Sequence, residues 1–152
     1  MTPAVLRIAR IAPPIITESP FRKLRPYSYR DADVFRGREI SIRDVADLVD
    51  EQALVVLHAP SGTGKTTLLH AGVRPALDDV FTWIEVEARG DVGALAADAV
   101  ARELAVRGHT ATGELAERVE QLAKLAGRAV LLVVDAVEEL FRGPDVEARI
   151  AT

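Results

Sequence analysis

A glycine-rich loop near the middle of the chain restricts the fold more than any other feature. Residues 59–66 read Ala-Pro-Ser-Gly-Thr-Gly-Lys-Thr and match the pattern Gly-x-x-x-x-Gly-Lys-Thr except at Ala59, which replaces the first glycine. The apolar run before the loop, residues 53–58, is typical of a buried strand, and residues 66–77 are typical of a helix that ends at Pro75. A strand that leads through a tight loop directly into a helix predicts an α/β fold.

The loop has the chemistry that binds a polyphosphate. Gly62 and Gly64 lack a Cβ, so they can adopt positive φ and let backbone N–H groups approach phosphate oxygens. The Lys65 ammonium can reach the β- and γ-phosphates, and the Thr66 hydroxyl can ligate Mg²⁺. The methyl group of Ala59 is tolerated if its φ is negative. The residues predicted to bind a nucleotide here are Ala59, Pro60, Ser61, Gly62, Thr63, Gly64, Lys65, Thr66 and Thr67.

Two later segments are predicted strands of the same sheet. Residues 81–87 are rich in aromatic and β-branched side chains, and residues 129–134 are continuously apolar. A continuously apolar strand is buried on both faces, which is typical of a parallel sheet covered by helices. The alternation of strands and helices therefore predicts a three-layer sandwich with a mainly parallel sheet.

Three further amphipathic helices are predicted from their caps and apolar stripes. The first begins at Ser41, which forms a variant capping box with Asp44. The second is capped by Asp91 and carries an apolar stripe of Val92, Leu95, Ala99 and Val100. The third ends at Gly127, a residue suited to the left-handed conformation of a helix terminus.

Acidic residues follow the last predicted strand. Asp135 ends that strand, and ligands of open α/β sheets bind beyond the carboxyl ends of the strands, so its carboxylate is expected to face the loop and to hold Mg²⁺ through water. Glu138 and Glu139 follow within one turn, and either could orient or deprotonate the water that attacks a γ-phosphate. The alternative is that these acids only cap a helix, since acids are favoured at helix N-termini.

Composition and charge argue against several other classes of protein. The chain has no cysteine, which removes disulfides, thiolate metal sites and thiol nucleophiles and fits a reducing cytoplasm. A net charge of −4 gives no general reason to bind nucleic acid or an anionic membrane. No stretch approaches the roughly 20 apolar residues of a membrane span. We therefore expect a soluble, cytoplasmic protein.

The first 30 residues differ from the rest of the chain. They hold six basic residues and one acidic residue, and prolines recur from Pro13 to Pro26. Each proline lacks an N–H donor and restricts the residue before it. We predict that residues 1–30 are a basic, extended lead-in and that residues 31–152 are the N-terminal part of the nucleotide-binding domain.

Four stretches together resemble the STAND class of P-loop NTPases, and within it the novel STAND NTPases. They begin with the entry segment SPFRKLRPYSYRDADVFRGRE and continue with HAPSGTGKTTLLHAGVRPAL, EARGDVGALAADAVARELA and LLVVDAVEELF. The likeness covers residues 19–142, and the combination of motifs is far more specific than any one of them. It implies an ATPase switch that holds ADP at rest, exchanges it for ATP on sensing a signal, and oligomerises within a larger signalling or defence protein.

The resemblance also implies a role for individual residues. It identifies residues 59–66 as the Walker A motif and residues 130–139 as the Walker B motif, with ATP or ADP and Mg²⁺ as the cofactors. The implied site residues are Arg38 near the nucleotide base, Lys65 and Thr66 at the phosphates and Mg²⁺, Asp135 as the Walker B acid, and Glu138 or Glu139 at the attacking water.

The same resemblance implies more strands than the sequence contains. In this class the sheet order is 5-1-4-3-2, so the strand after Walker B lies between the loop strand and the Walker B strand, and none can be read before Thr152. Unpaired ladder groups are costly. We therefore expect an incomplete sheet, from a fragment or remnant that self-associates or pairs with the rest of a larger STAND protein. The alternative is direct pairing of the two strands, as in the GTPase and kinase branch.

Two other functions stay open at this point. A small P-loop kinase needs an arginine-rich lid after the Walker B strand, and the ten residues after Phe141 offer only Arg142 and Arg149. A non-catalytic interaction module would keep the fold without the chemistry, and Ala59 and Ala136 at motif positions favour it somewhat.

Overall fold

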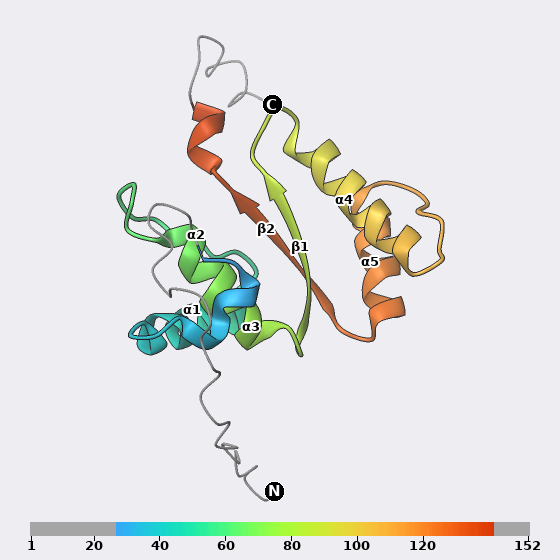
Figure 1. Cartoon of the computed structure of the whole chain (residues 1–152). Helices are drawn as coiled ribbons and strands as arrows, with labels where there is room; N and C mark the ends of the chain where they lie inside the picture. The colour runs from blue at the N-terminus through green and yellow to red at the C-terminus, as the bar shows by residue number, and fades with distance from the viewer. Residues whose placement is uncertain (1–26, 142–152) are drawn as a thin grey trace, which may run out of the picture.

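A two-stranded parallel sheet lies at the centre of the computed structural model, which describes residues 27–141 (Figure 1). Strand β1 (Phe81–Glu87) pairs with β2 (Ala129–Asp135), and the register aligns Glu87 with Asp135. Both predicted strands are confirmed, as is their parallel direction. Their carboxyl ends therefore meet at one edge of the sheet, where the acidic residues follow β2.

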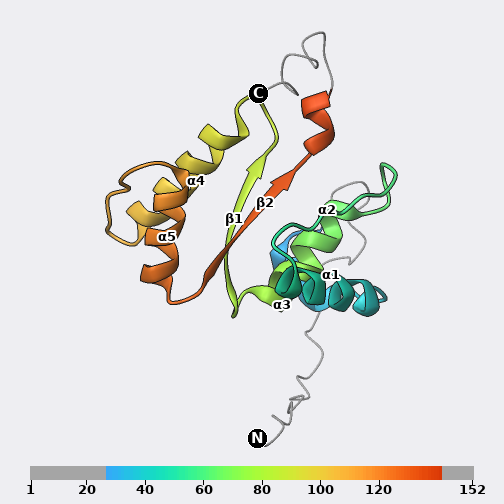
Figure 2. The same ribbon diagram turned by 180° about the vertical axis from the view of Figure 1, so that it is seen from behind.

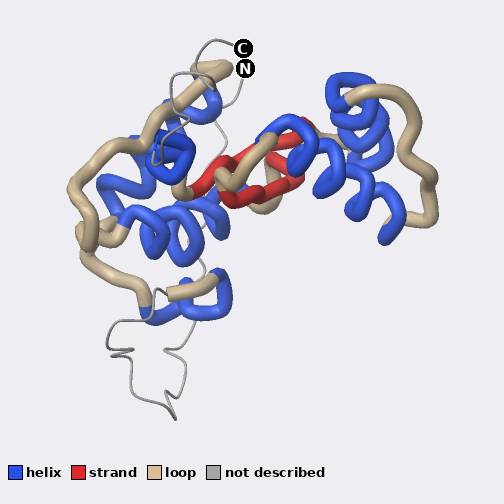
Figure 3. The backbone as a smooth tube through the Cα atoms, turned by 90° about the horizontal axis from the view of Figure 1, so that it is seen from above, coloured by secondary structure: helices blue, strands red, loops and turns tan. Residues whose placement is uncertain are grey.

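Helices cover both faces of this sheet, as the view from above shows (Figure 3). On one face lie α4 (Val92–Val106) and α5 (Leu115–Ala126). On the other face lies one continuous helical segment over residues 65–77, which we call the loop helix. Its parts are α2 (Lys65–Thr67), the π-helical η2 (Leu68–Val73) and α3 (Arg74–Leu77).

Two more elements pack against the loop helix. They are the 3₁₀ segment η1 (Tyr29–Val34) and α1 (Glu39–Glu51), of which α1 lies in front of the loop helix in Figure 2. The described chain is thus a mixed α/β arrangement of three layers around a sheet of two strands. The α/β class is confirmed, and the sheet is smaller than the three strands that the sequence predicted.

Each face of the sheet has its own apolar cluster. Side chains alternate along a strand, so neighbouring residues of β1 point to opposite faces. Ile84 packs toward α4 and α5, whereas Trp83 packs toward the loop helix. The fully buried members of the two clusters are Val100, Leu104 and Leu122 on the first face and Val73 on the second. Burial of each such side chain stabilises the fold by about 1.5–3 kcal/mol.

The segment before the glycine-rich loop is not a strand. Residues 53–58 have no regular secondary structure, and Leu54 and Val56 are 82% and 79% exposed. Leu57 alone of this run packs against the cluster on the loop-helix side. The prediction of a buried strand is therefore wrong, and so is direct pairing with β2, which pairs only with β1 among the described residues. A strand exists through ladder hydrogen bonds to a neighbour, and this segment has none.

Two predicted helix boundaries also need correction. Helix α1 begins at Glu39, because the Glu39 carboxylate accepts a 2.9 Å hydrogen bond from the N–H of Gly37 and closes the turn before the helix. Ser41 is therefore inside the helix and forms no capping box. The hydrogen bond from Gly37 lowers the pKa of Glu39 below its ordinary value. The loop helix does not end at Pro75 but passes through it to Leu77.

The other two helix caps are confirmed. The Asp91 side chain caps α4 by accepting a 3.0 Å hydrogen bond from the N–H of Ala94, and Gly127 ends α5 with φ 67°. Leu95 of the predicted stripe is exposed, whereas Val100, which was predicted on the same stripe, is fully buried. The inward face of α4 lies along Ala96, Val100 and Leu104.

The predicted basic lead-in lies largely outside the described residues and stays a prediction. The described part begins at Tyr27, whose backbone N–H donates to the Thr67 hydroxyl at 3.3 Å, so this part of the chain contacts the loop helix. Between residues 27 and 141, none of the helices combines the length and the apolar character needed to cross a membrane.

Candidate functional site

The glycine-rich loop adopts the backbone that its sequence requires. Gly62 and Gly64 have φ of 80° and 84°, values that a residue with a Cβ adopts only under strain. Within residues 27–141, Ala136 is the one residue other than glycine with positive φ. The φ of Ala59 is therefore not positive, and the alanine in place of the first glycine fits the loop without backbone strain.

Hydrogen bonds within the loop hold it closed. The Thr63 hydroxyl donates to the carbonyl of Pro60 at 2.8 Å, which closes a turn that contains Gly62. The Lys65 ammonium donates to the carbonyl of Ala59 at 2.8 Å. The Lys65 ammonium thus lies at the start of the loop, beside the backbone that is expected to surround phosphate.

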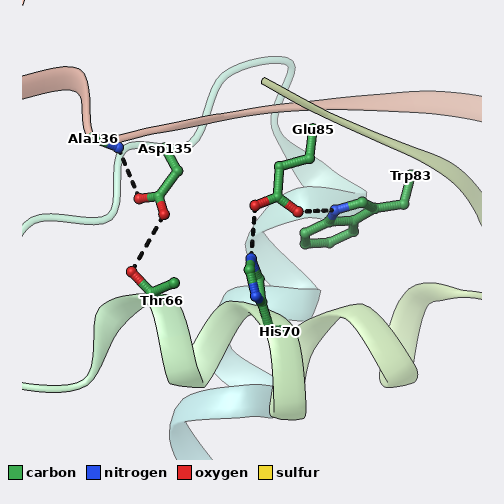
Figure 4. Close-up of polar contacts among 6 residues, drawn as sticks. All are labelled: Thr66, His70, Trp83, Glu85, Asp135 and Ala136. Carbon is green, nitrogen blue, oxygen red and sulfur yellow. Dashed lines mark hydrogen bonds and ion pairs between the residues drawn. The ribbon is translucent and has the colours of Figure 1, made fainter. Parts of the chain in front are cut away.

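The start of the loop helix meets the acid at the end of β2 (Figure 4). The Thr66 hydroxyl donates to Oδ2 of Asp135 at 3.3 Å, although the two residues are 69 positions apart. The other oxygen of Asp135 accepts a 2.8 Å hydrogen bond from the N–H of Ala136, whose φ of 57° turns the chain away from the strand. The fold therefore brings together the hydroxyl and the carboxylate that the sequence assigned to Mg²⁺.

Arg38 reaches the loop from the start of α1. Its Nη2 donates to the carbonyl of Thr63 at 2.7 Å. A hollow of about 290 Å³ opens between α1 and the loop, and its lining includes Arg38, Asp44, Leu57, Thr63 and Lys65. The Gly37-Arg38 segment is thus beside the glycine-rich loop.

Glu138 and Glu139 follow Asp135 in the 3₁₀ segment η3 (Val137–Phe141), and both are exposed. The N–H of Glu139 donates to the carbonyl of Ala136 at 2.9 Å, so this turn begins directly after the strand. Glu139 also lines a second hollow, of about 440 Å³, with Glu87 and Arg89 beyond the end of β1. The predicted catalytic acids therefore lie at the same edge of the sheet as Asp135.

The donors at this edge suit Mg²⁺ with a phosphate, and not a metal held by protein alone. Among the described residues there is no group of three or more His, Cys, Asp or Glu side chains that could hold a metal ion. Thr66 and Asp135 supply two oxygen donors. Mg²⁺ commonly takes one or two protein oxygens, with water and substrate phosphates as its other ligands. This donor set fits the ion.

A polar network that was not predicted lies one turn farther along the loop helix. His70 Nε2 lies 2.7 Å from Oε1 of Glu85 on β1, and the indole N–H of Trp83 donates to Oε2 of the same carboxylate at 3.1 Å (Figure 4). The available signal was the spacing. His70 lies four residues after Thr66, on the same side of a helix. Trp83 and Glu85 are two residues apart in a strand, so their side chains point to the same face.

Comparison with known proteins gives one match. A family model described as nSTAND1, Novel STAND NTPase 1, matches residues 20–151. The match covers the glycine-rich loop, the loop helix and both strands of the sheet. No curated protein and no solved structure matches the chain.

Proposed function

This chain belongs to the novel STAND NTPase 1 family, and from that premise we propose that it binds ATP or ADP with Mg²⁺ as the switch domain of a signalling protein. The observation that carries the proposal is the contact between Thr66 and Asp135. It joins a loop with two left-handed glycines to an acid at the end of a parallel strand. Nucleotides bind at this place in open α/β sheets.

Each group in the proposed site has a physical role. The N–H groups at the start of the loop helix point toward one place and favour an anion there. The Lys65 ammonium would exchange its bond to the Ala59 carbonyl for charge-assisted bonds to phosphate oxygens. Thr66 and Asp135 would hold Mg²⁺, which neutralises charge on the β- and γ-phosphates when bound. Arg38 is proposed to lie near the base, on the α1 side of the loop.

Replacing Lys65 tests this site. Calorimetric titration of the chain with Mg-ADP or Mg-ATP should show that Lys65→Ala weakens binding about tenfold or more, because charge-assisted bonds to phosphate are lost. Lys124→Ala is the matched control, since Lys124 pairs with Glu120 on the exposed surface of α5. Equal affinities of the wild type and Lys65→Ala would contradict the proposed site.

We further propose that Glu138 or Glu139 orients the attacking water when the bound nucleotide is hydrolysed. Substitution of the responsible acid by glutamine should lower the rate of phosphate release roughly 100-fold and leave Mg-ATP affinity unchanged, since general bases contribute about that much. Glu87→Gln, at the end of the neighbouring strand, is the control. Unchanged turnover in both Glu138→Gln and Glu139→Gln would contradict this role. An absence of turnover in the wild type would favour a switch that only binds.

A further inference from the structure

Two polar contacts on successive turns join the loop helix to the two strands of the sheet (Figure 4). Thr66 contacts Asp135 at the end of β2, and one turn later His70 contacts Glu85 of β1. Glu85 lies two residues before Glu87, which is aligned with Asp135. A helical turn rises about 5.4 Å and two strand residues span about 6.6 Å. The spacing of one helical turn therefore matches the spacing of the side chains that point from the sheet toward the loop helix.

The Glu85 carboxylate is held from two sides. His70 occupies one oxygen and the Trp83 indole N–H the other, at 2.7 Å and 3.1 Å. An ionised carboxylate only accepts hydrogen bonds, which assigns a proton to Nε2 of His70. The His70 and Glu85 side chains are each 26% exposed, so solvent competes with the contact only in part. Their orientation is consequently fixed.

The apolar contacts of the loop helix act differently. Its buried side chains, Leu68, Val73 and Leu77, pack by contact that has no preferred direction. The segment Leu68–Val73 is also π-helical, so the helix departs from the regular α-helical register directly after Thr67. A directional hydrogen bond at His70 fixes the helix at this point.

We propose that His70 and Glu85 are positioning residues for the Mg²⁺ side of the nucleotide site. They hold the loop helix so that the Thr66 hydroxyl stays beside the Asp135 carboxylate. This inference rests on the proposed function, and it places neither residue in contact with nucleotide. Lys65 and the glycine-rich loop bind phosphate without help from the pair. Loss of the His70–Glu85 pair should therefore weaken nucleotide binding in the presence of Mg²⁺. Nucleotide binding without Mg²⁺ should be unchanged.

The test compares ADP affinity with Mg²⁺ and with EDTA, by calorimetry on the full chain. The ratio of the two affinities should fall about tenfold in His70→Leu and in Glu85→Leu, as for other residues that orient metal ligands indirectly. The double variant should show no further fall, because the two residues act as one unit. His70→Gln retains an N–H donor and should restore most of the ratio.

Leu77→Ala is the structural control. It removes a buried side chain from the same helix without touching the His70–Glu85 contact. It should lower the free energy of unfolding and leave the affinity ratio unchanged. A fall of the ratio in Leu77→Ala equal to that in His70→Leu would overturn the inference, as would an unchanged ratio in His70→Leu or additive effects in the double variant.

A measurement on the wild type tests the positioning role if the leucine variants do not fold. The chain has one tryptophan, so the single indole N–H signal in an NMR spectrum reports directly on Glu85. Slow solvent exchange of this proton with ADP alone and with Mg-ADP supports a Glu85 carboxylate that stays in place in both states, and loss of protection on adding Mg²⁺ overturns the inference. Absence of ADP binding by the wild type overturns the proposed function as well, whereas binding with an unchanged ratio in His70→Leu overturns only this inference.

Discussion

On the face of the sheet that α4 and α5 cover, the residues of β1 are buried, among them Ile84 and Val86. On the face that the loop helix covers they are half-buried, among them Trp83 and Glu85. The first face packs through apolar contact, and the second adds hydrogen bonds between helix and strands. Apolar burial stabilises without direction, whereas hydrogen bonds fix relative position. Apolar burial therefore stabilises both faces, and the loop-helix face adds hydrogen bonds that fix the helix against the strands.

The largest expected effect is a loss of stability on the α4/α5 face. Leu104 is completely buried between α4, α5 and β1, so Leu104→Ala should lower the free energy of unfolding by about 2–5 kcal/mol. Urea denaturation measures this change. Leu95→Ala, on the exposed side of the same helix, is the control and should cost much less. Similar losses in the two variants would break the distinction between the inner and outer sides of α4.

The next effect is on binding and belongs to the loop-helix face. Asp135→Asn keeps the shape of the side chain and the bond from the Ala136 N–H, but it removes the charge beside Thr66. Mg-ADP affinity should fall about 10- to 100-fold, with little change in the urea midpoint. Calorimetry measures the Mg-ADP affinity, and urea denaturation of the same sample measures its stability. A large loss of stability with unchanged affinity would show that Asp135 serves the fold and not the site.

The smallest effect returns to the α4/α5 face and uses a second aspartate. Asp91 caps α4 shortly after β1 ends, so Asp91→Ala should lower the free energy of unfolding by about 1 kcal/mol without changing Mg-ADP affinity. Asp91→Asn is the matched control, because asparagine also caps helices. The distinction between the two faces is supported if Asp91→Ala changes stability alone and Asp135→Asn changes affinity alone. Weaker nucleotide binding in Asp91→Ala would contradict it.

Local sequence signals predicted the elements of the α4/α5 face well. Both strands were predicted from short apolar or β-branched runs, and α4 and α5 from Asp91 and Gly127. These signals act within a few residues, so they do not depend on what packs against them. The prediction at residues 53–58 was wrong because a strand also needs a partner, which composition cannot supply.

The candidate site was predicted only in part, because some of its contacts also depend on how the elements pack. Gly62, Gly64 and the chain direction at Asp135 follow from motif and topology, and the structure brings Thr66 and Asp135 into contact. The His70–Glu85 contact was missed, because the spacing of His70 and Glu85 in their elements does not show which helix meets which strand until the two elements pack.

By itself, the sequence determined the conformation of the glycine-rich loop, the two strands, the caps of α4 and α5, and membership in the novel STAND NTPase 1 family. These properties depend on φ preferences and on short-range periodicity. Packing of the elements against one another determines that residues 53–58 stay unpaired and that Thr66 and His70 meet Asp135 and Glu85. Those outcomes depend on how a helix lies against a sheet, which is set by packing and directional hydrogen bonds between residues far apart in the chain.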